Sequence, residues 1–177
     1  MTSLREYGVD TTGVVDITKL KTGTIPKEEY GVICSRSVIP CHDVLVNYKD
    51  QGALLIVRKH APVDKTIWCI GGKINRGMNT EDSLRKKVRE ECGLELKNIT
   101  YHGTARLFFA TDPFGHGKGH DVLVAMYFAD GEGEINLDSM HEQPMFITPE
   151  KYTAKFRTQL HPYIKDYMDA WIKYIKR

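Results

Sequence analysis

The sequence predicts an α+β domain that combines a mixed sheet with a few helices. Two apolar segments on either side of a polar turn predict a hairpin over 42–48 and 53–58. A glycine pair at 71–72 leads into a capped helix that closes at Gly93, and apolar residues recur at helical spacing after residue 159. Because strands and helices do not alternate regularly, an α+β arrangement is favoured.

The start of the chain is polar and only weakly periodic. We expect residues 1–25 to form an N-terminal arm, followed by one domain over 26–177 that includes a C-terminal helix. Pro26, followed by two acidic residues, predicts the start of a helix because proline and carboxylates both suit the first turn. We expect Tyr30, Ile33 and Cys34 to share one face of this helix.

The middle of the chain predicts a strand, a turn and a helix in succession. A short strand over 67–70 leads into a turn at the glycine pair. Asn79 or Thr80 can cap the next helix, whose first turn is acidic. Four residues apart on its buried side lie Leu84 and Val88.

Later elements are predicted from apolar runs and glycine-rich breaks. They are an extended segment over 94–109, strands over 122–129 and 145–147, and a short helix beginning within 149–155. The loop over 112–120 contains two histidines and Lys118, so it could close over an anion, although plain flexibility explains it equally well. The aromatic stripe of the C-terminal amphipathic helix, which includes Trp171, favours core packing.

Composition limits the functional class. The chain has 177 residues, 41% hydrophobic and 27% charged, with a net charge of +2, which is too weak to indicate nucleic-acid binding. Without an N-terminal apolar segment or a run near the roughly 20 residues of a membrane span, we expect a cytoplasmic protein that binds no membrane. Four cysteines without C-x-x-C spacing favour reduced thiols over a zinc site.

Two adjacent carboxylates, Glu90 and Glu91, are the most suggestive chemical feature. Mg²⁺ prefers oxygen ligands and keeps phosphate oxygens in its shell, so these residues beside a glycine turn could hold it against a pyrophosphate. The alternative is that Lys86 and Lys87 form i,i+4 ion pairs with them on a solvated helix face. Charge alone favours the ion pairs, whereas the glycine pair and the fixed distance to Gly93 favour the metal.

The segment 72–94 resembles the Nudix box, G-x5-E-x7-R-E-U-x-E-E-x-G-U, in which U is an aliphatic residue. Met78 stands where the first glutamate belongs, and Lys86 and Lys87 replace the Arg-Glu pair. The resemblance implies the Nudix fold, an α/β/α sandwich with a mixed β-sheet between helices. It also implies a hydrolase of nucleotide derivatives that uses Mg²⁺ or Mn²⁺. Starting from Gly72, the positions in register are Val88, Glu90, Glu91, Gly93 and Leu94.

Residues 26–155 are most similar to the GDP-mannose mannosyl hydrolase branch. That branch also lacks the glutamate replaced here by Lys87, uses a single metal, and cleaves at the sugar carbon. The resemblance implies that the carbonyl of Gly71 and the carboxylate of Glu91 hold the metal, with Glu90 nearby as a ligand or catalytic group.

Other positions of that branch carry over to substrate binding. Asp43 falls on a position linked to sugar binding, and Arg58 and Lys73 fall on positions that stabilise the departing diphosphate. His120 has a histidine counterpart. Taken alone, Arg58 could equally be a solvated charge, whereas Asp43, set between apolar residues, needs a polar partner and so favours a site.

The catalytic base of the branch matches His141, in a late loop over 138–142. A histidine titrates near neutral pH and can take a proton from water, although a lone histidine in a charged loop is often only a surface residue. Met140 replaces a glutamine ligand of the metal.

These observations predict a Mg²⁺-dependent hydrolase of a nucleoside diphosphate sugar that releases the sugar and the nucleoside diphosphate. The first alternative is pyrophosphate cleavage of another nucleotide derivative. The second is a catalytically silent Nudix domain that binds a nucleotide or a protein. The arm and the aromatic C-terminal helix are also compatible with a homodimer.

Overall fold

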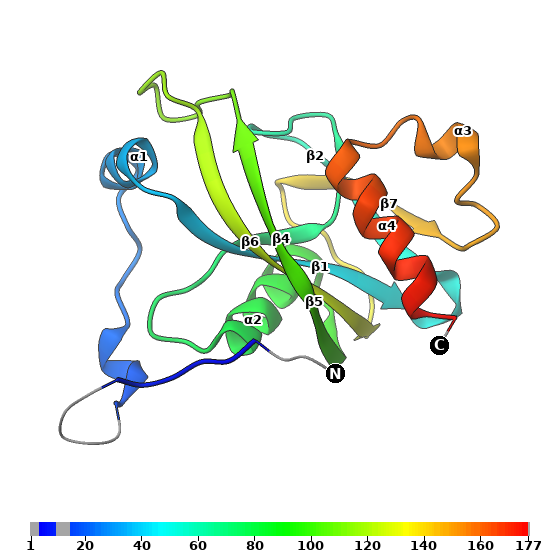
Figure 1. The fold of residues 1–177 in the computed structure, drawn as a ribbon, viewed down its shortest axis with the longest axis horizontal. Coiled ribbons are helices and arrows are strands. Elements are labelled where there is room, and N and C mark those ends of the chain that lie inside the picture. The colour runs from blue at the N-terminus through cyan, green and yellow to red at the C-terminus, as the bar shows by residue number, and fades with distance from the viewer. Residues whose placement is uncertain (1–3, 10–14, 177) are drawn as a thin grey trace.

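The computed structural model describes residues 4–9 and 15–176 and contains one mixed sheet (Figure 1). The strand order is β3-β2-β1-β6-β5, with β4 paired to β1 and β7 paired to β2. β1 and β6 run parallel, and their other pairings are antiparallel. The strands are β1 (Ile39–Tyr48), β2 (Ala53–Arg58), β3 (Ile67–Trp68), β4 (Ile70–Lys73), β5 (Glu95–Phe109), β6 (His120–Glu132) and β7 (His141–Ile147).

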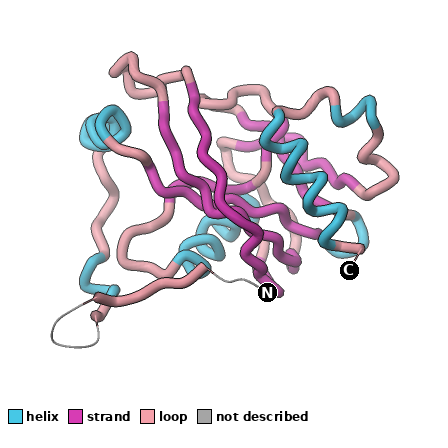
Figure 2. Tube along the Cα trace, viewed as in Figure 1, coloured by secondary structure: helices cyan, strands magenta, loops and turns pink. Residues whose placement is uncertain are grey.

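Helices α2 (Thr80–Cys92) and α4 (Pro162–Tyr174) cover opposite faces of the sheet, as two neighbouring residues of β1 demonstrate (Figures 1 and 2). His42 Nε2 lies 2.8 Å from Ser83 Oγ of α2, whereas the carboxylate of Asp43 accepts a hydrogen bond from Tyr163 of α4. Adjacent side chains of a strand point to opposite faces. The predicted α/β/α sandwich is therefore confirmed.

Helix α2 begins and ends as its sequence predicts. The side chain of Asn79 accepts a hydrogen bond from Asp82 N at 2.8 Å, and Gly93 follows the helix with a φ of 74°. Positive φ is inexpensive for glycine, so it ends the helix cleanly. Leu84 and Val88 are completely buried, as expected.

Helix α1 (Lys27–Arg36) lies at one end of the sheet, beside the loop that joins β5 to β6 (Figure 1). The Tyr30 ring packs edge-on against Phe114, with centroids 5.3 Å apart, and Cys34 is buried. The side chain of Ile33, in contrast, is exposed. The helix contacts the domain along a narrower stripe than its apolar residues indicate.

The N-terminal arm lies against the start of α2. The Glu6 carboxylate accepts hydrogen bonds from Thr80 N at 3.0 Å and from Thr80 Oγ1 at 2.8 Å. Farther along, the 3-10 helix η1 (Ile17–Leu20) is held by a hydrogen bond from Arg76 Nε to Leu20 O. Residues 1–3 and 10–14 of the predicted arm lie outside the described residues, and the division at residue 25 stays a prediction.

Several element boundaries differ from the prediction because strand pairing extends them. The glycine pair is not a turn but part of β4, where Gly71 pairs with Asp43 of β1. The predicted 138–142 loop stops early, because His141 is the first residue of β7 and pairs with Arg58. The predicted strand over 122–129 extends across 120–132 opposite β5.

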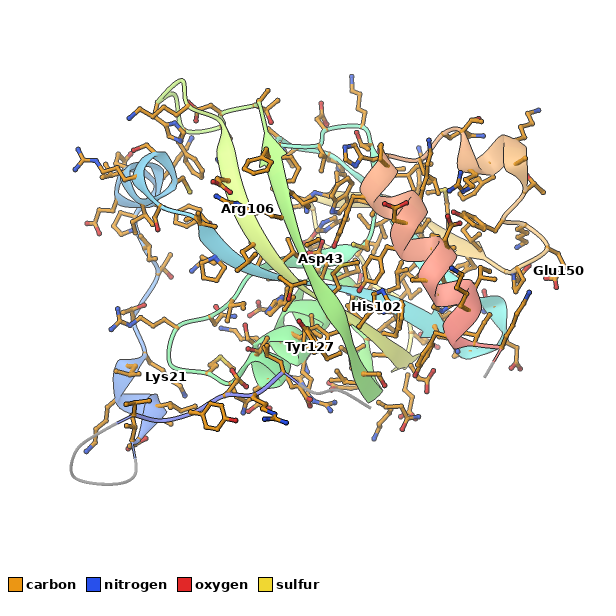
Figure 3. All side chains as sticks on the ribbon, viewed as in Figure 1. Lys21, Asp43, His102, Arg106, Tyr127 and Glu150 are labelled. Carbon is orange, nitrogen blue, oxygen red and sulfur yellow. The ribbon has the colours of Figure 1, made fainter. Side chains whose placement is uncertain are left out.

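The end of the chain packs as a core helix. The tightly buried aromatic residues of α4 include Tyr167, whose hydroxyl accepts a hydrogen bond from Tyr127 N and donates one to Asp43 O at 3.1 Å. Short helix α3 (Ala154–Arg157) begins within the range 149–155 that the sequence predicts. Asp43 lies near the centre of the molecule (Figure 3). Among the described residues, every helix is too short or too polar to span a bilayer.

Candidate functional site

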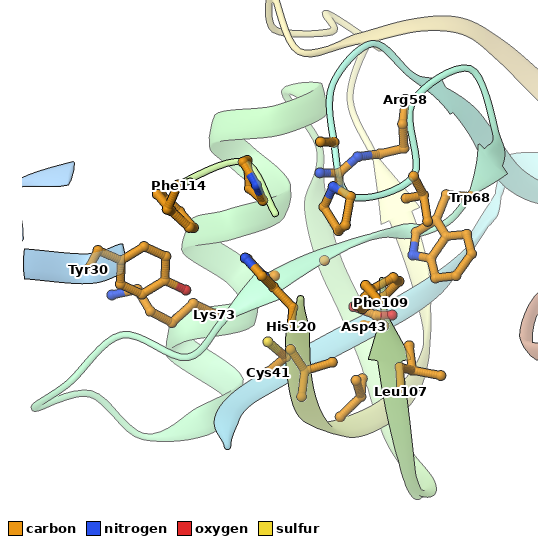
Figure 4. Close-up of a pocket in the computed structure, with 18 residues that line it drawn as sticks. Tyr30, Cys41, Asp43, Arg58, Trp68, Lys73, Leu107, Phe109, Phe114 and His120 are labelled. Atoms are coloured by element: carbon orange, nitrogen blue, oxygen red, sulfur yellow. The ribbon is translucent and has the colours of Figure 1, made fainter. Parts of the chain in front are cut away.

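A cavity of about 250 Å³ opens on the face of the sheet that α4 partly covers (Figure 4). Asp43 of β1 and Val124 of β6 contribute to its base, and Gly71 and Gly72 of β4 lie along it. Pockets for small molecules are typically about 300–1,000 Å³, so this cavity fits one ring-sized part of an extended ligand. Its aromatic walls are formed by Tyr30, Trp68, Phe109 and Phe114.

The four residues expected to bind substrate all line this cavity. Asp43 comes from β1, Arg58 from the end of β2, Lys73 from the end of β4, and His120 from the start of β6. Figure 4 shows the Arg58 guanidinium and the His120 ring directed toward the same space. The cations Arg58 and Lys73, beside an aromatic enclosure, suit an anionic ligand that carries a ring.

Asp43 is the buried carboxyl group of the cavity. Burial raises its pKa to about 6, although hydrogen bonds from Tyr163 and Cys69 and the charge of Arg58 act in the opposite direction. Tyr163 Oη lies 2.9 Å from Asp43 Oδ2, and Cys69 Sγ lies 3.6 Å from the same oxygen. These contacts fix the carboxyl group at the base of the cavity, where it can accept a hydrogen bond from a ligand.

Beside the cavity, Glu91 of α2, Asp138 and His141 of β7 form a compact cluster. One potential ligand atom from each lies within 4.8 Å of the others. Asp138 Oδ1 is 2.7 Å from His141 Nδ1, which leaves His141 Nε2 facing Glu91 Oε2 at 3.9 Å. Both of these facing atoms are buried and lack a hydrogen-bond partner.

The cluster fits a divalent cation by its donor set and by its unsatisfied atoms. Burial raises the pKa of Glu91, while the charges of Lys87, His141 and Arg58 counteract this effect only in part. A cation beside Glu91 would favour the ionised carboxylate and would satisfy its buried Oε2. His141 Nε2 would then remain free to accept a hydrogen bond from a water molecule.

The two neighbouring glutamates have different surroundings. The side chain of Glu90 is 56% exposed and pairs with Lys86 at 3.8 Å. The side chain of Glu91 is only 12% exposed and lies 3.5 Å from Lys87 Nζ. The alternative of an ion pair on a solvated helix face therefore applies to Glu90, which the structure does not bring into the cluster. Glu91 forms an ion pair and also belongs to the cluster.

Arg58 connects the cluster to the cavity. Its backbone pairs with that of His141 across β2 and β7, and its side chain lines the cavity. Arg58 Nε is buried without a hydrogen-bond partner. A guanidinium in this position can bind two oxygens of a phosphate group with its planar fork.

Two important residues, Asp138 and Tyr163, carry no assigned role in the sequence prediction. Asp138 stands three residues before His141, and this spacing in a turn is a signal that could have identified it. The partner of Tyr163 is Asp43, 120 residues away in the chain, so no local pattern reveals the contact.

Two further site residues act, in this structure, through their backbone. Met140, whose side chain is exposed, donates a hydrogen bond from its amide to Asp138 Oδ1 at 2.9 Å. Gly71 lies in the β4 pairing with β1, close to the Asp43 side chain. The expected role of the Gly71 carbonyl as a metal ligand stays a prediction.

Comparisons with known proteins agree with this fold. The low-salt glycan biosynthesis protein Agl8 of Haloferax volcanii is 25% identical over 150 residues, covering 84% of this chain and 92% of that protein. The NAD-capped RNA hydrolase NudC of Photobacterium profundum is 29% identical over 119 residues, which are 63% of this chain but only 40% of that protein.

Solved structures are similar in fold at low sequence identity. A MutT Nudix hydrolase from Burkholderia pseudomallei superposes with a TM-score of 0.55 at 21% identity, covering 70% of this chain and 96% of that one. A MutT protein from Methanosarcina mazei gives 0.61 at 16% identity, covering 79% and 96%. A family model described as the NUDIX domain matches residues 42–169. Because that match spans most of the chain and coincides with the observed sandwich, the chain belongs to the Nudix hydrolase family.

Proposed function

We propose that this hydrolase acts on a nucleoside diphosphate sugar of the GDP-mannose type and releases the free sugar and the nucleoside diphosphate. The observation that carries the proposal is the hydrogen bond between His141 and Asp138, which leaves His141 Nε2 free beside Glu91. Arg58, on the neighbouring strand β2, pairs with His141. The water-activating group therefore comes from β7 and not from the box helix. This matches the position of Lys87, which cannot act as a metal ligand or a base when charged.

The cluster would hold Mg²⁺, or Mn²⁺, through Glu91 and Asp138, with His141 Nε2 beside the ion and not bound to it. When bound there, the ion would neutralise charge on the diphosphate. Glu91 gives the site one inward carboxylate from the box helix, since Glu90 faces solvent. This supports a single ion in place of a multi-metal site.

In the proposed reaction, His141 Nε2 takes a proton from water. The water oxygen forms a bond to the anomeric carbon of the sugar, and the bond from that carbon to the diphosphate oxygen breaks. The electron pair of that bond remains on the diphosphate, where Arg58 and Lys73 stabilise the negative charge. Asp138 accepts the Nδ1 proton of His141 in a hydrogen bond and so keeps Nε2 free.

Substrate recognition would use the aromatic cavity and Asp43. The sugar or the base would occupy the ring-sized space, with Asp43 accepting a hydrogen bond from it. The name of Agl8, a glycan biosynthesis protein, supports a sugar nucleotide. The name of NudC supports the second candidate, pyrophosphate cleavage of another nucleotide derivative, for which the same cluster would hold the metal.

Product analysis in ¹⁸O-labelled water separates the two reactions. The protein is incubated with a panel of sugar nucleotides and Mg²⁺ or Mn²⁺, and the nucleotide product is examined by mass spectrometry. Attack at carbon yields an unlabelled nucleoside diphosphate. Label in a phosphate group, or a nucleoside monophosphate product, would show attack at phosphorus. If no compound in the panel is hydrolysed, the proposal fails, and the alternative of a catalytically silent binding domain is favoured.

His141→Ala tests the catalytic base. We expect kcat to fall by about 10²–10⁴-fold with little change in KM, because general bases typically contribute this much. Mn²⁺ affinity, measured by electron paramagnetic resonance, should remain near that of the unsubstituted protein. An equal loss of Mn²⁺ affinity would instead assign His141 as a metal ligand. His60→Ala, at an exposed histidine, is the matched control and should change neither quantity.

A further inference from the structure

The loop between β5 and β6 holds a second group of metal-ligating side chains, which shares no residue with the Glu91 cluster. Asp112, His116 and His120 each offer one ligand atom, and these atoms all lie within 4.8 Å of one another. The loop stands beside α1 at one end of the long β5–β6 hairpin (Figure 1). Asp112 and His116 have no role in the proposed hydrolysis. His120 lines the cavity wall.

The backbone of this loop brings the three side chains together. Gly115, Gly117 and Gly119 have positive φ values of 79°, 70° and 67°, which glycine adopts at low cost. The Asp112 carboxylate accepts hydrogen bonds from the amides of Phe114, at 2.9 Å, and Gly115, at 3.0 Å, and also from the amide of Gly117. The loop is therefore folded around the Asp112 carboxylate.

Both histidines present buried nitrogens without hydrogen-bond partners. His116 Nε2 and His120 Nε2 are shielded from solvent, and His116 Nε2 lies 3.3 Å from Asp112 Oδ1. The His120 ring stacks on Phe114, with centroids 5.4 Å apart and planes at 4°, so it is held in place (Figure 4). Leaving such atoms unsatisfied costs free energy, and a bound ion would remove that cost.

The donor set indicates which kind of ion would bind. Two imidazoles and one carboxylate suit first-row transition metals, whereas Mg²⁺ prefers oxygen ligands and water. Three protein ligands also leave a coordination position open.

We propose that Asp112, His116 and His120 form a binding site for a transition-metal ion of the Zn²⁺ class, which fixes the loop at the mouth of the substrate cavity. A metal on His116 Nε2 places the ring proton on Nδ1. The 3.2 Å contact in which Lys118 N donates to Nδ1 is then lost, so the Lys118 amide turns to solvent. The proposal does not depend on the reaction proposed above.

Equilibrium dialysis against Zn²⁺ in a large excess of Mg²⁺ tests the site, with bound zinc measured by elemental analysis. We expect the intact protein to retain one zinc ion that Mg²⁺ does not displace, and His116→Ala to lose it. His116→Cys should bind zinc again, because a thiolate is a zinc ligand. Since a thiolate cannot replace the stacking of an imidazole, this result would show that the side chain at 116 acts as a ligand. His60→Ala is the control and should bind as the unsubstituted protein does.

Circular dichroism of each variant without metal shows whether it is folded, and the absorption spectrum of bound Co²⁺ reports the ligands directly. The proposal is overturned if the intact protein retains no zinc under these conditions. It is also overturned if His116→Ala and His120→Ala both retain the ion, or if only Glu91→Gln releases it. That last result would place zinc in the Glu91 cluster.

Discussion

His42 and Asp43, neighbours on β1, are buried on opposite faces of the sheet and titrate in opposite senses. Burial lowers the pKa of His42 to about 4 and raises the pKa of Asp43 to about 6. His42 is thus neutral in the folded protein where it would be protonated in the unfolded chain. Asp43 holds a proton where the unfolded chain has released it. Each effect is on the order of 3 kcal/mol at its upper limit.

The two residues should therefore give opposite pH dependence between about pH 4 and 6. For His42, the unfolded chain binds more protons, so its contribution to stability is lost as the pH falls. For Asp43, the folded protein binds more protons, so stability is gained as the pH falls through about 6. Urea unfolding of Asp43→Asn should show a steeper loss of stability in acid than the unsubstituted protein shows.

His42→Gln is the complementary variant, and its free energy of unfolding should decline less in acid than that of the unsubstituted protein. Both variants remove buried hydrogen bonds and will be less stable at every pH, so the slope with pH and not the absolute value is the readout. Parallel pH profiles for all three proteins would contradict the assignment of these two pKa values.

At this scale the sequence is informative about residue types and less so about their orientation. Glu90 and Glu91 are equivalent in the sequence, yet one faces solvent and the other faces the cluster. A helical rotation of about 100° per residue is enough to separate them. Which of the two faces inward depends on how α2 packs on the sheet, and this packing is not encoded in the local charges.

At the scale of elements, strand β4 lies so close to β1 at Gly71 that no space is left for a side chain. A Cβ atom at Gly71 would lie against Asp43 Oδ1 and 2.5 Å from His42 O. Real side chains cannot occupy such positions unless the strands move apart. Gly71 is therefore required by packing, independently of any role of its carbonyl.

Gly71→Ala should destabilise the protein by about 1–3 kcal/mol or more, the usual cost of overpacking. Urea unfolding measures the loss, and the fluorescence of the nearby Trp68 should report the disturbed cavity. Gly103→Ala in β5 is the matched control, because a Cβ there meets nothing within 4 Å. Equal effects of the two substitutions would show that the contact with Asp43 can relax without cost.

Elements with local signals were predictable, and those that depend on a distant partner were not. Helix α2 has a capping residue, an acidic first turn and a terminal glycine, and these local signals predict its limits correctly. The sequence predicts a turn at the glycine pair because nothing local indicates pairing with β1, which lies far earlier in the chain. The start of β7 is hidden in the sequence for the same reason, since it depends on pairing with β2.

At the scale of the whole molecule, the site is made where distant segments meet. The cluster of Glu91, Asp138 and His141 joins α2 to β7, and Arg58 of β2 joins this cluster to the cavity. Helix α4, on the face of the sheet opposite α2, fixes the Asp43 carboxyl group through Tyr163. Since the aromatic stripe of α4 is used inside the domain, it no longer argues for the homodimer, which stays a prediction.

Because the cluster joins separate elements, a divalent ion bound there should stabilise the entire fold. Mg²⁺ at a concentration of about 100 times its Kd should add about 2.7 kcal/mol to the free energy of unfolding. Glu91→Gln should gain far less. Without metal this variant should be at least as stable as the unsubstituted protein, since burial raises the pKa of Glu91 and the neutral amide avoids the cost of a buried charge.

Glu90→Gln, one residue away and exposed, should respond to Mg²⁺ as the unsubstituted protein does. Thermal unfolding with and without Mg²⁺ measures all three, and an equal gain in every protein would place the ion elsewhere.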